Sequence, residues 1–293
     1  MNGILVVDKP QGFTSFDVVA KLRGICKMKK IGHGGTLDPM ATGVLPVFLG
    51  TATRAMDLQP RQDKCYEAAL LLGLQTDTGD ITGEVLRRAP VTVGEKELLA
   101  VLPRFLGAQS QLPPMYSAVK INGKPLYRYA REGKEVERKP RSITIHSLDY
   151  LGPGPGKHEY RLRVHCAKGT YIRTLCEDVG TALSLPAALA ALRRTAAGVY
   201  TAEQAHTLEE IQAAADARRL EALLHPVEEL FAEYPALALT PAQKERLLNG
   251  APLWDISAAP GMYRACQGNA FLGLVRPDGE GALRLVRLFC TRD

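Results

Sequence analysis

The most informative segment of the chain reads Ile31-Gly-His-Gly-Gly-Thr-Leu-Asp-Pro-Met-Ala-Thr-Gly-Val-Leu-Pro46. Glycines and prolines surround one carboxylate, Asp38, and residues 30–50 are rich in Gly and Thr, which predicts a long loop. The Asp38-Pro39 dipeptide is typical of a plain turn. A single acid in so constrained a loop is also typical of a positioned nucleophile or base, so both interpretations stay open at this point.

Familiar phosphate and metal motifs do not account for this loop or for the rest of the chain. The loop lacks the Gly-Lys-Ser/Thr of a P-loop and the glycine spacing of a dinucleotide fingerprint. Ser117-Ala-Val-Lys120 matches one motif of serine acyl-transfer enzymes, but the partner motifs of that class are missing. No zinc-deaminase motif occurs, and the six histidines have no metal-ligand spacing. We therefore expect neither a metal nor a cofactor.

The composition is that of a folded globular protein. Of the 293 residues, 46% are apolar and 23% are charged, which excludes a disordered chain and fits one large domain with or without a small one. No apolar run is long enough for a membrane span or a signal peptide. The six cysteines form no Cys-x-x-Cys pair, which favours reduced thiols in a cytoplasmic protein.

The net charge of +6 is unevenly spread along the chain. Residues 115–145 hold eight cations against three acids, and the first 37 residues carry a further excess of four positive charges. Residues 201–235 are the reverse, with eight acids against two arginines. A charge run is often just a solvated face. Here, however, Tyr116, Tyr127 and Tyr129 interleave with the cations, a pattern that suits phosphates and unstacked bases of RNA.

Periodicity predicts strands over residues 4–7, 65–72 and 160–166, the last with alternating apolar and basic side chains. It predicts helices after Thr14, over residues 95–105 and 125–133, and from Ile172 to Leu183. Beyond Tyr234-Pro235, turn signals separate short apolar runs, which indicates a small β-rich domain over residues 236–293.

Six blocks of the chain, in order, resemble those of the TruB-type tRNA pseudouridine synthases. The loop around Asp38 resembles the signature loop of that family, although Gly34 stands where the family usually has Thr. The other blocks are Val7-Asp-Lys-Pro-Gln-Gly-Phe-Thr-Ser15, Lys64-Cys-Tyr66 with Gly73-Leu-Gln-Thr-Asp-Thr-Gly-Asp80, Pro114-Met-Tyr-Ser-Ala-Val-Lys-Ile-Asn-Gly-Lys124, Cys166-Ala-Lys-Gly-Thr-Tyr-Ile-Arg173 and Leu192-Arg-Arg-Thr195.

The resemblance implies an α+β pseudouridine synthase fold over residues 1–235, with a central mixed, largely antiparallel sheet flanked by helices. A basic RNA-gripping insertion would occupy about 109–145, and residues 236–293 would form a PUA-type RNA-binding domain. The implied reaction isomerises the uridine at position 55 in the T-loop of tRNA, without a cofactor. Its catalytic residues would be Asp38, Tyr66 and Arg173.

The resemblance also implies contacts with the T-stem and loop of tRNA. His33 would act as a wedge beside the displaced uridine, and the remaining RNA-binding residues would be Lys9, Lys64, Tyr171, Lys120, Lys124, Arg128, Arg131 and Arg141. We expect a monomer that associates with no membrane. The alternative function is that of a tRNA-binding or tRNA-folding protein in which catalysis is absent or secondary.

Overall fold

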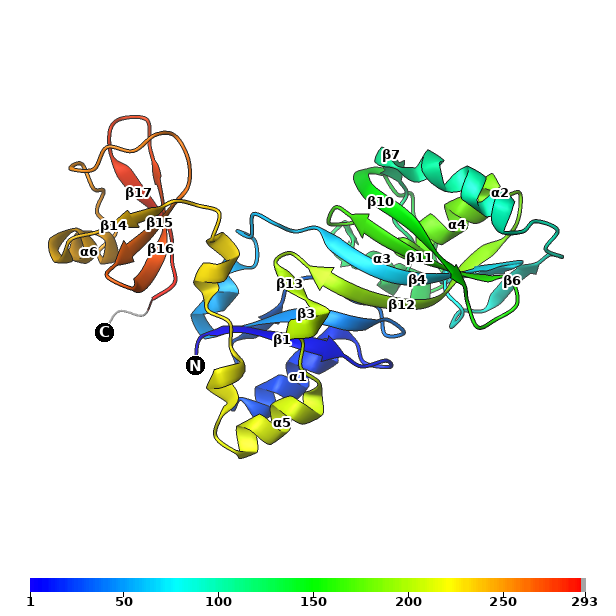
Figure 1. The fold of residues 1–293 in the computed structure, drawn as a ribbon, viewed down its shortest axis with the longest axis horizontal. Coiled ribbons are helices and arrows are strands. Elements are labelled where there is room, and N and C mark those ends of the chain that lie inside the picture. Colours follow the sequence, from blue (N-terminus) through cyan, green and yellow to red (C-terminus); the bar gives the residue numbers. More distant parts are fainter. Residues whose placement is uncertain (291–293) are drawn as a thin grey trace.

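The computed structural model describes residues 1–290 and contains one large sheet (Figure 1). Its strands run in the order β1 (Gly3–Lys9), β3 (Thr42–Leu49), β12 (Ala187–Ala197), β4 (Lys64–Leu72), β11 (Glu159–Cys166), β10 (Arg141–Pro153) and β7 (Gly107–Gln111). Two short strands, β2 (Ile31–His33) and β13 (Tyr200–Thr201), pair with β3 and β12. Among the described residues of this sheet, β3 and β12 form the one parallel pair, so the predicted mixed, largely antiparallel sheet is confirmed.

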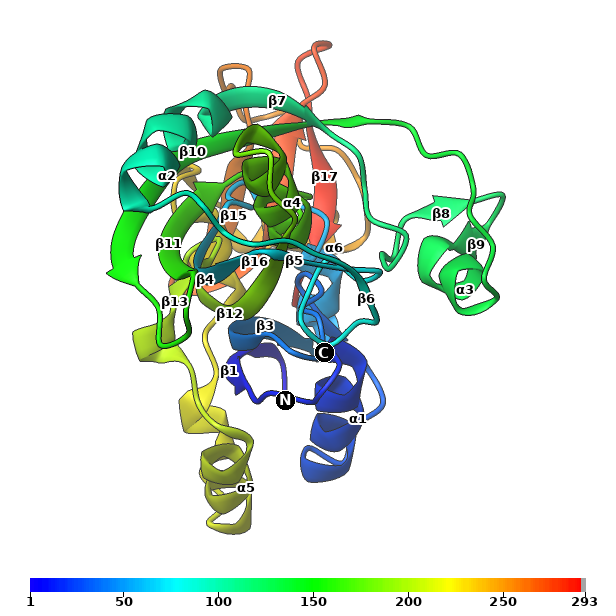
Figure 2. The ribbon, with the colours of Figure 1, turned by 90° about the vertical axis from the view of Figure 1, so that its right-hand side faces the viewer.

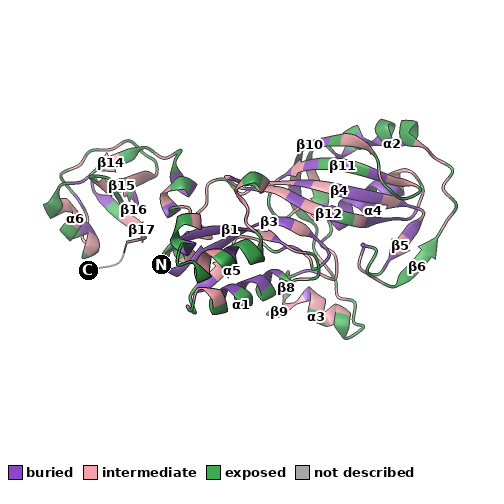
Figure 3. Cartoon of the chain, turned by 60° about the horizontal axis from the view of Figure 1, so that its bottom comes forward, coloured by how far each residue is buried: buried purple, intermediate pink, exposed green. Residues whose placement is uncertain are grey.

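Helices pack against both halves of this sheet. α1 (Ser15–Ile25) and α5 (Leu208–Asp216) bury apolar side chains against β1 and β3, whereas α2 (Glu95–Val101) and α4 (Ile172–Ala182) pack with the strands of the other half. Figure 3 shows the buried face of α1 beneath β1 and β3. α1 begins with a capping box, in which the Thr14 hydroxyl accepts from the Asp17 N–H and the Asp17 carboxylate accepts from the Thr14 N–H. The predicted helix start is therefore confirmed.

The prediction of a long loop over residues 30–50 is wrong, because this segment contains all of β2 and β3. The side chains of Val44, Leu45, Val47 and Phe48 are fully buried, as in a strand covered on both faces. A continuous apolar run of this kind lacks the alternation that identifies a half-exposed strand. The glycines and prolines around it therefore masked a central strand, and the loop that remains is the short segment around Asp38.

Two hairpins and a helix project from the large sheet. The first hairpin joins β5 (Leu74–Thr76) and β6 (Val85–Arg88). The basic insertion contains the second, formed by β8 (Lys120–Ile121) and β9 (Lys124–Pro125), and α3 (Leu126–Arg131), which begins after Pro125 as predicted. Figure 2 shows β8, β9 and α3 projecting from the rest of the molecule.

The C-terminal residues form a separate sheet with its own apolar core. Its strands run in the order β14 (Ala236–Ala238), β15 (Tyr263–Gln267), β16 (Ala270–Pro277) and β17 (Leu283–Leu288), with α6 (Pro241–Leu248) beside them. The predicted β-rich C-terminal domain is confirmed, and it lies at the opposite end of the molecule from α2 (Figure 1). Among the helices of residues 1–290, none combines the length and apolar character needed to cross a membrane.

The remaining regular elements are short 3-10 helices that connect these parts of the chain. They are η1 (Gly50–Ala55), η2 (Leu102–Phe105), η3 (Ala202–Gln204), η4 (Leu220–Leu223) and η5 (Val227–Phe231). Phe231, the last residue of η5, is fully buried at the junction between the large sheet and the C-terminal sheet. Its ring centroid lies 5.5 Å from that of Phe289 and 6.2 Å from that of Phe271.

We predict that Phe231→Ala lowers the free energy of unfolding by about 3–5 kcal/mol, because truncation leaves a cavity among stacked rings. Denaturant titration measures the loss. Limited proteolysis should also cut the variant faster between η5 and β14, where the two parts of the chain join. Leu86→Ala is the control, since its side chain is 64% exposed and the expected change is within about 0.5 kcal/mol. Equal stability of both variants would contradict a packed junction.

Candidate active site

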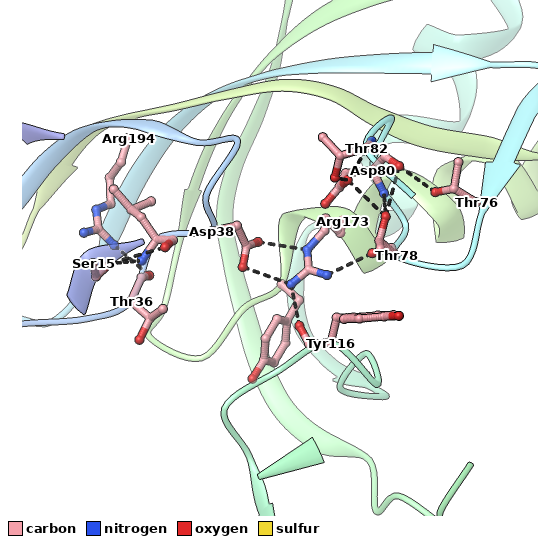
Figure 4. A network of polar contacts seen from close by, with 12 residues as sticks. Ser15, Thr36, Asp38, Thr76, Thr78, Asp80, Thr82, Tyr116, Arg173 and Arg194 are labelled. Atoms are coloured by element: carbon pink, nitrogen blue, oxygen red, sulfur yellow. Dashed lines mark hydrogen bonds and ion pairs between the residues drawn. The ribbon is translucent and has the colours of Figure 1, made fainter. Parts of the chain in front are cut away.

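Asp38 and Arg173 form an ion pair between segments that are far apart in the sequence. Asp38 lies in the loop after β2, and Arg173 is the second residue of α4. Arg173 Nε donates to Asp38 Oδ2 at 2.9 Å and Nη2 donates to Oδ1 at 3.1 Å, a bidentate geometry (Figure 4). The guanidinium also donates to the carbonyl oxygens of Thr78 and Tyr116, both at 2.8 Å. These four contacts fix the orientation of the carboxylate.

Burial and charge act in opposite directions on this carboxylate. The Arg173 side chain is 3% exposed, whereas that of Asp38 is 32% exposed and faces open space. Desolvation raises the pKa of Asp38, and the neighbouring Arg173 guanidinium opposes this shift by favouring the charged form. An oriented carboxylate that a ligand can still reach is suited to act as a nucleophile or as a base.

Lys9 supports the Asp38 loop through a hydrogen bond to Pro39 and does not contact solvent. Its side chain is fully buried, and its ammonium donates to three carbonyl oxygens, those of Pro10, Phe13 and Pro39, at 2.8, 2.6 and 3.3 Å. Desolvation lowers its pKa to about 8. The prediction that Lys9 holds an RNA phosphate is therefore wrong for this structure, because the ammonium has no path to a phosphate. Ser15 also holds the loop, since its Oγ accepts from Leu37 N at 2.8 Å.

Arg194, a residue of β12, supports the same loop, and the sequence patterns considered above did not predict this role. Its side chain is 1% exposed, and Nε donates to Val44 O at 2.6 Å. Its Nη atoms donate to the carbonyls of Thr36 and Gly35 at 3.4 and 3.2 Å. The β12 backbone at Arg194 also passes so close to Gly43 that a Cβ there would lie 2.2 Å from Arg194 O. Gly43 has φ +100°, so both space and conformation require glycine.

One signal for Arg194 was present in the sequence. Neighbouring residues of a strand point to opposite faces, so one member of the Arg193-Arg194 pair must point inward. In the structure Arg193 forms a bidentate ion pair with Asp8, at 3.0 and 2.8 Å, and Arg194 points to the other side. Recognising residues 187–197 as a strand would have identified Arg194 as a buried cation.

A cavity of about 470 Å³ opens beside the Asp38 carboxylate. Five of the predicted site residues line it together with Asp38, and they come from β2, β4 and the start of α4: His33, Lys64, Tyr66, Tyr171 and Arg173. Arg194 and Leu192 of β12 complete this wall. A second cavity of about 560 Å³ also reaches Asp38 and Arg173, and it extends between α1 and the insertion. Asp38 thus lies where the two cavities meet.

Each of the other cavity residues has a distinct environment. Tyr66 is 7% exposed, and burial raises the pKa of its hydroxyl while the adjacent Arg194 opposes the shift. Desolvation lowers the pKa of Lys64 to about 8, and burial also lowers the pKa of His33. Among the described residues, His33 Nδ1 is buried without a hydrogen-bond partner. The backbone of Tyr171 is fixed, because its N–H donates to Gln111 Oε1 at 2.8 Å.

The predicted RNA-binding cations of the insertion lie outside the first cavity. Lys120, Arg128, Arg131 and Arg141 are exposed or half-buried, and Arg131 also lines the second cavity. Lys124 is half-buried, with its ammonium paired with Glu132 and 4.5 Å from the Tyr129 ring centroid. Arg131 therefore shares the second cavity with Asp38 and Arg173, and the Tyr116 carbonyl connects the insertion directly to Arg173.

Two family models match consecutive parts of the chain. The one described as TruB family pseudouridylate synthase (N terminal domain) matches residues 23–172, and the one described as tRNA pseudouridylate synthase B C-terminal domain matches residues 173–232. The chain belongs to the TruB family of pseudouridine synthases. It is therefore an enzyme of the isomerase class, as the resemblance implied, and isomerisation of uridine to pseudouridine in tRNA is the activity of that family.

Relatives of the TruB family match nearly the whole chain. The tRNA pseudouridine synthase B of Azoarcus sp. (strain BH72) is 46% identical over 292 residues, covering 100% of this chain and 96% of the relative. That of Lachnoclostridium phytofermentans (strain ATCC 700394 / DSM 18823 / ISDg) is 50% identical over 259 residues, covering 86% and 84%. Among solved structures, a Cbf5-Nop10-Gar1 complex contains a chain that is 25% identical with a TM-score of 0.75, covering 99% of this chain and 86% of that one.

Gly34, the visible departure from the TruB pattern, lies directly against a buried ring. A Cβ at this position would be 2.8 Å from Phe48 Cε2, so any larger side chain requires the ring to move. Phe48 is fully buried in β3. The small residue at position 34 and the large one at position 48 thus compensate each other in volume.

We predict that Gly34→Ala alone destabilises the protein by about 1–3 kcal/mol, as overpacking does in other cores. Combined with Phe48→Leu, the same substitution should cost less, because the smaller side chain makes room for the added methyl group. A double-mutant cycle on the free energy of unfolding measures this coupling. If the two changes in the free energy of unfolding are additive, the side chains at positions 34 and 48 do not compete for the same space.

Proposed function

We propose that this TruB enzyme isomerises the uridine at position 55 in the T-loop of tRNA, with Asp38 as the catalytic carboxylate. One observation carries the proposal. A carboxylate held bidentately by a buried arginine lies at the meeting point of two cavities, beside the ring of Tyr66. Each cavity is within the range that takes a small ligand such as one nucleotide.

The reaction requires no reagent from outside the site. The bond between uracil N1 and ribose C1′ breaks, the base turns, and C5 bonds to C1′. The C5 proton leaves and N1 gains one, so atoms and charge balance. Asp38 acts at the ribose, as nucleophile or as base, and Arg173 keeps its carboxylate oriented and charged. Tyr66, which lines the first cavity, presents its ring to the base, and we assign to its hydroxyl the removal of the C5 proton.

The target uridine must leave its stack before it reaches Asp38. His33 lines both cavities, so its ring lies where a displaced nucleotide would enter. Lys64 and Tyr171 also line the first cavity. We assign all three to RNA binding rather than to proton transfer.

The insertion supplies the electrostatic contact with the T-stem and loop. Its cations Lys120, Arg128 and Arg131 lie outside the large sheet and Arg141 begins β10; all four are exposed, which suits contact with a phosphate backbone. We propose that the C-terminal sheet acts as a PUA-like RNA-binding domain and that the enzyme works as a monomer. A protein that binds or folds tRNA without turnover is the remaining alternative, and the first experiment below separates the two.

We predict that Asp38→Asn reduces pseudouridine formation in an unmodified tRNA transcript by at least about 10⁴-fold, the scale of losing a catalytic nucleophile. Tritium release from labelled uridine measures turnover. Binding of the tRNA should change little, because the insertion is untouched. Asp149→Asn, an exposed acid on β10, is the matched control with normal turnover expected. A wild-type enzyme without product at stoichiometric concentration would favour the binding protein, and an active Asp38→Asn variant would remove Asp38 from the mechanism.

We also predict that affinity for tRNA falls as salt rises, because bound cations release counterions from the phosphates. Neutralising Lys120 and Arg128 together to Gln should lower the slope of log K against log salt by roughly 0.7–0.9 for each phosphate that is no longer neutralised. Filter binding at several salt concentrations measures the slope. Arg219→Gln, in the acidic segment, should leave it unchanged. An affinity that does not depend on salt would contradict phosphate contact by the insertion.

A further inference from the structure

Asp63, His146 and His165 meet at one end of the large sheet although they are far apart in the sequence. His165 is in β11, His146 is in the neighbouring strand β10, and Asp63 directly precedes β4 on the other side of β11 (Figure 1). The register of β10 against β11 skips from Ile145 to Ser147, so His146 is the extra residue of a bulge. Bulges re-aim side chains, and this one directs His146 toward His165.

The distances within this cluster are close to those of a metal site. His146 Nε2 lies 3.3 Å and His165 Nε2 lies 3.9 Å from Asp63 Oδ2, and the two imidazole centroids are 4.7 Å apart. One ligand atom from each residue falls within 4.8 Å of the others. Tetrahedral zinc, with bonds of about 2.0–2.1 Å, places neighbouring ligand atoms roughly 3.3 Å apart. Side-chain rotations that move the ligand atoms by about an ångström would give the tetrahedral spacing.

We propose that Asp63, His146 and His165 bind one divalent transition-metal ion of the zinc class. Two imidazole nitrogens and one carboxylate are a common zinc ligand set, whereas Mg²⁺ and Ca²⁺ prefer oxygen ligands throughout. All three side chains are between 37% and 51% exposed, so the ion enters without unfolding, and its fourth position is open to water.

Ordinary histidine–carboxylate contacts elsewhere in the chain show what sets this cluster apart. His206 lies 3.8 Å from Glu210, and His225 lies 2.9 Å from Glu229, each with a single imidazole on one carboxylate. Within residues 1–290, Asp63, His146 and His165 are the one group of three such ligands. A bound ion would join the ends of β4, β10 and β11, from which the chain leads to Tyr66 and to the segment before Arg173.

The test titrates Zn²⁺ into the full-length, tag-free protein in competition with a chromophoric chelator. We expect one equivalent to bind. Loss of a residue that only hydrogen-bonds to a metal ligand weakens metal binding by roughly 10- to 100-fold. Because Asp63→Asn, His146→Gln and His165→Gln each remove a ligand, each should weaken binding by more than that. Co²⁺ should give the visible absorption of a tetrahedral site in the wild type and not in these three variants. Zn²⁺ should also raise the melting temperature of the wild type, because the ion binds the folded state.

His206→Gln is the matched control, since it removes an imidazole that contacts one carboxylate. It should keep full Zn²⁺ binding. Melting curves without metal verify that each variant is folded, so a loss of binding reports on the ligands. No binding by the wild type in competition with the chelator would overturn the proposal. Binding that the three substitutions leave unchanged would overturn it as well, because the ion would then lie elsewhere. Neither outcome bears on Asp38, whose role is measured by turnover.

Discussion

The structure around the cavities depends on one buried ion pair, that of Asp38 and Arg173. A buried guanidinium is costly unless a charge and further hydrogen bonds satisfy it, and removing one partner of such a pair typically costs about 3–5 kcal/mol. The chain satisfies the Arg173 guanidinium with groups from three places: Asp38 in the loop after β2, Thr78 in the β5–β6 hairpin and Tyr116 in the insertion. The same guanidinium that orients the carboxylate therefore also fixes the surrounding loops.

This arrangement connects the insertion with the Asp38 carboxylate. Tyr116 belongs to the insertion, and its carbonyl accepts from the Nη2 atom that also donates to Asp38. Movement of the insertion on binding a nucleic acid would change the hydrogen bonding of Arg173, and with it the electrostatic surroundings of Asp38. The coupling passes through a main-chain carbonyl, so the identity of the side chain at position 116 does not carry it.

Local patterns predicted those elements whose signals are local. The capping box fixed the start of α1, and alternation identified β11, because both features arise from neighbours in the sequence. β3 was missed because a strand buried on both faces has no alternation. The place of Lys9 was missed because a buried lysine among carbonyls has no sequence signature. The spacing of the histidines gave no sign of the Asp63 cluster either, since β-sheet register and a bulge bring His146 beside His165.

Two buried arginines face the first cavity, and they differ in how their charge is satisfied. Arg173 has a carboxylate partner, whereas Arg194 has hydrogen bonds to carbonyl oxygens, and the ion pairs found among residues 1–290 do not include it. Its uncompensated charge acts on its neighbours, since it helps to lower the pKa values of Lys64 and His33 and favours the ionised form of Tyr66. A positive wall of this kind favours an anionic ligand. Under the proposed function, that ligand is the target nucleotide, and the same positive charge is placed to stabilise negative charge on its base.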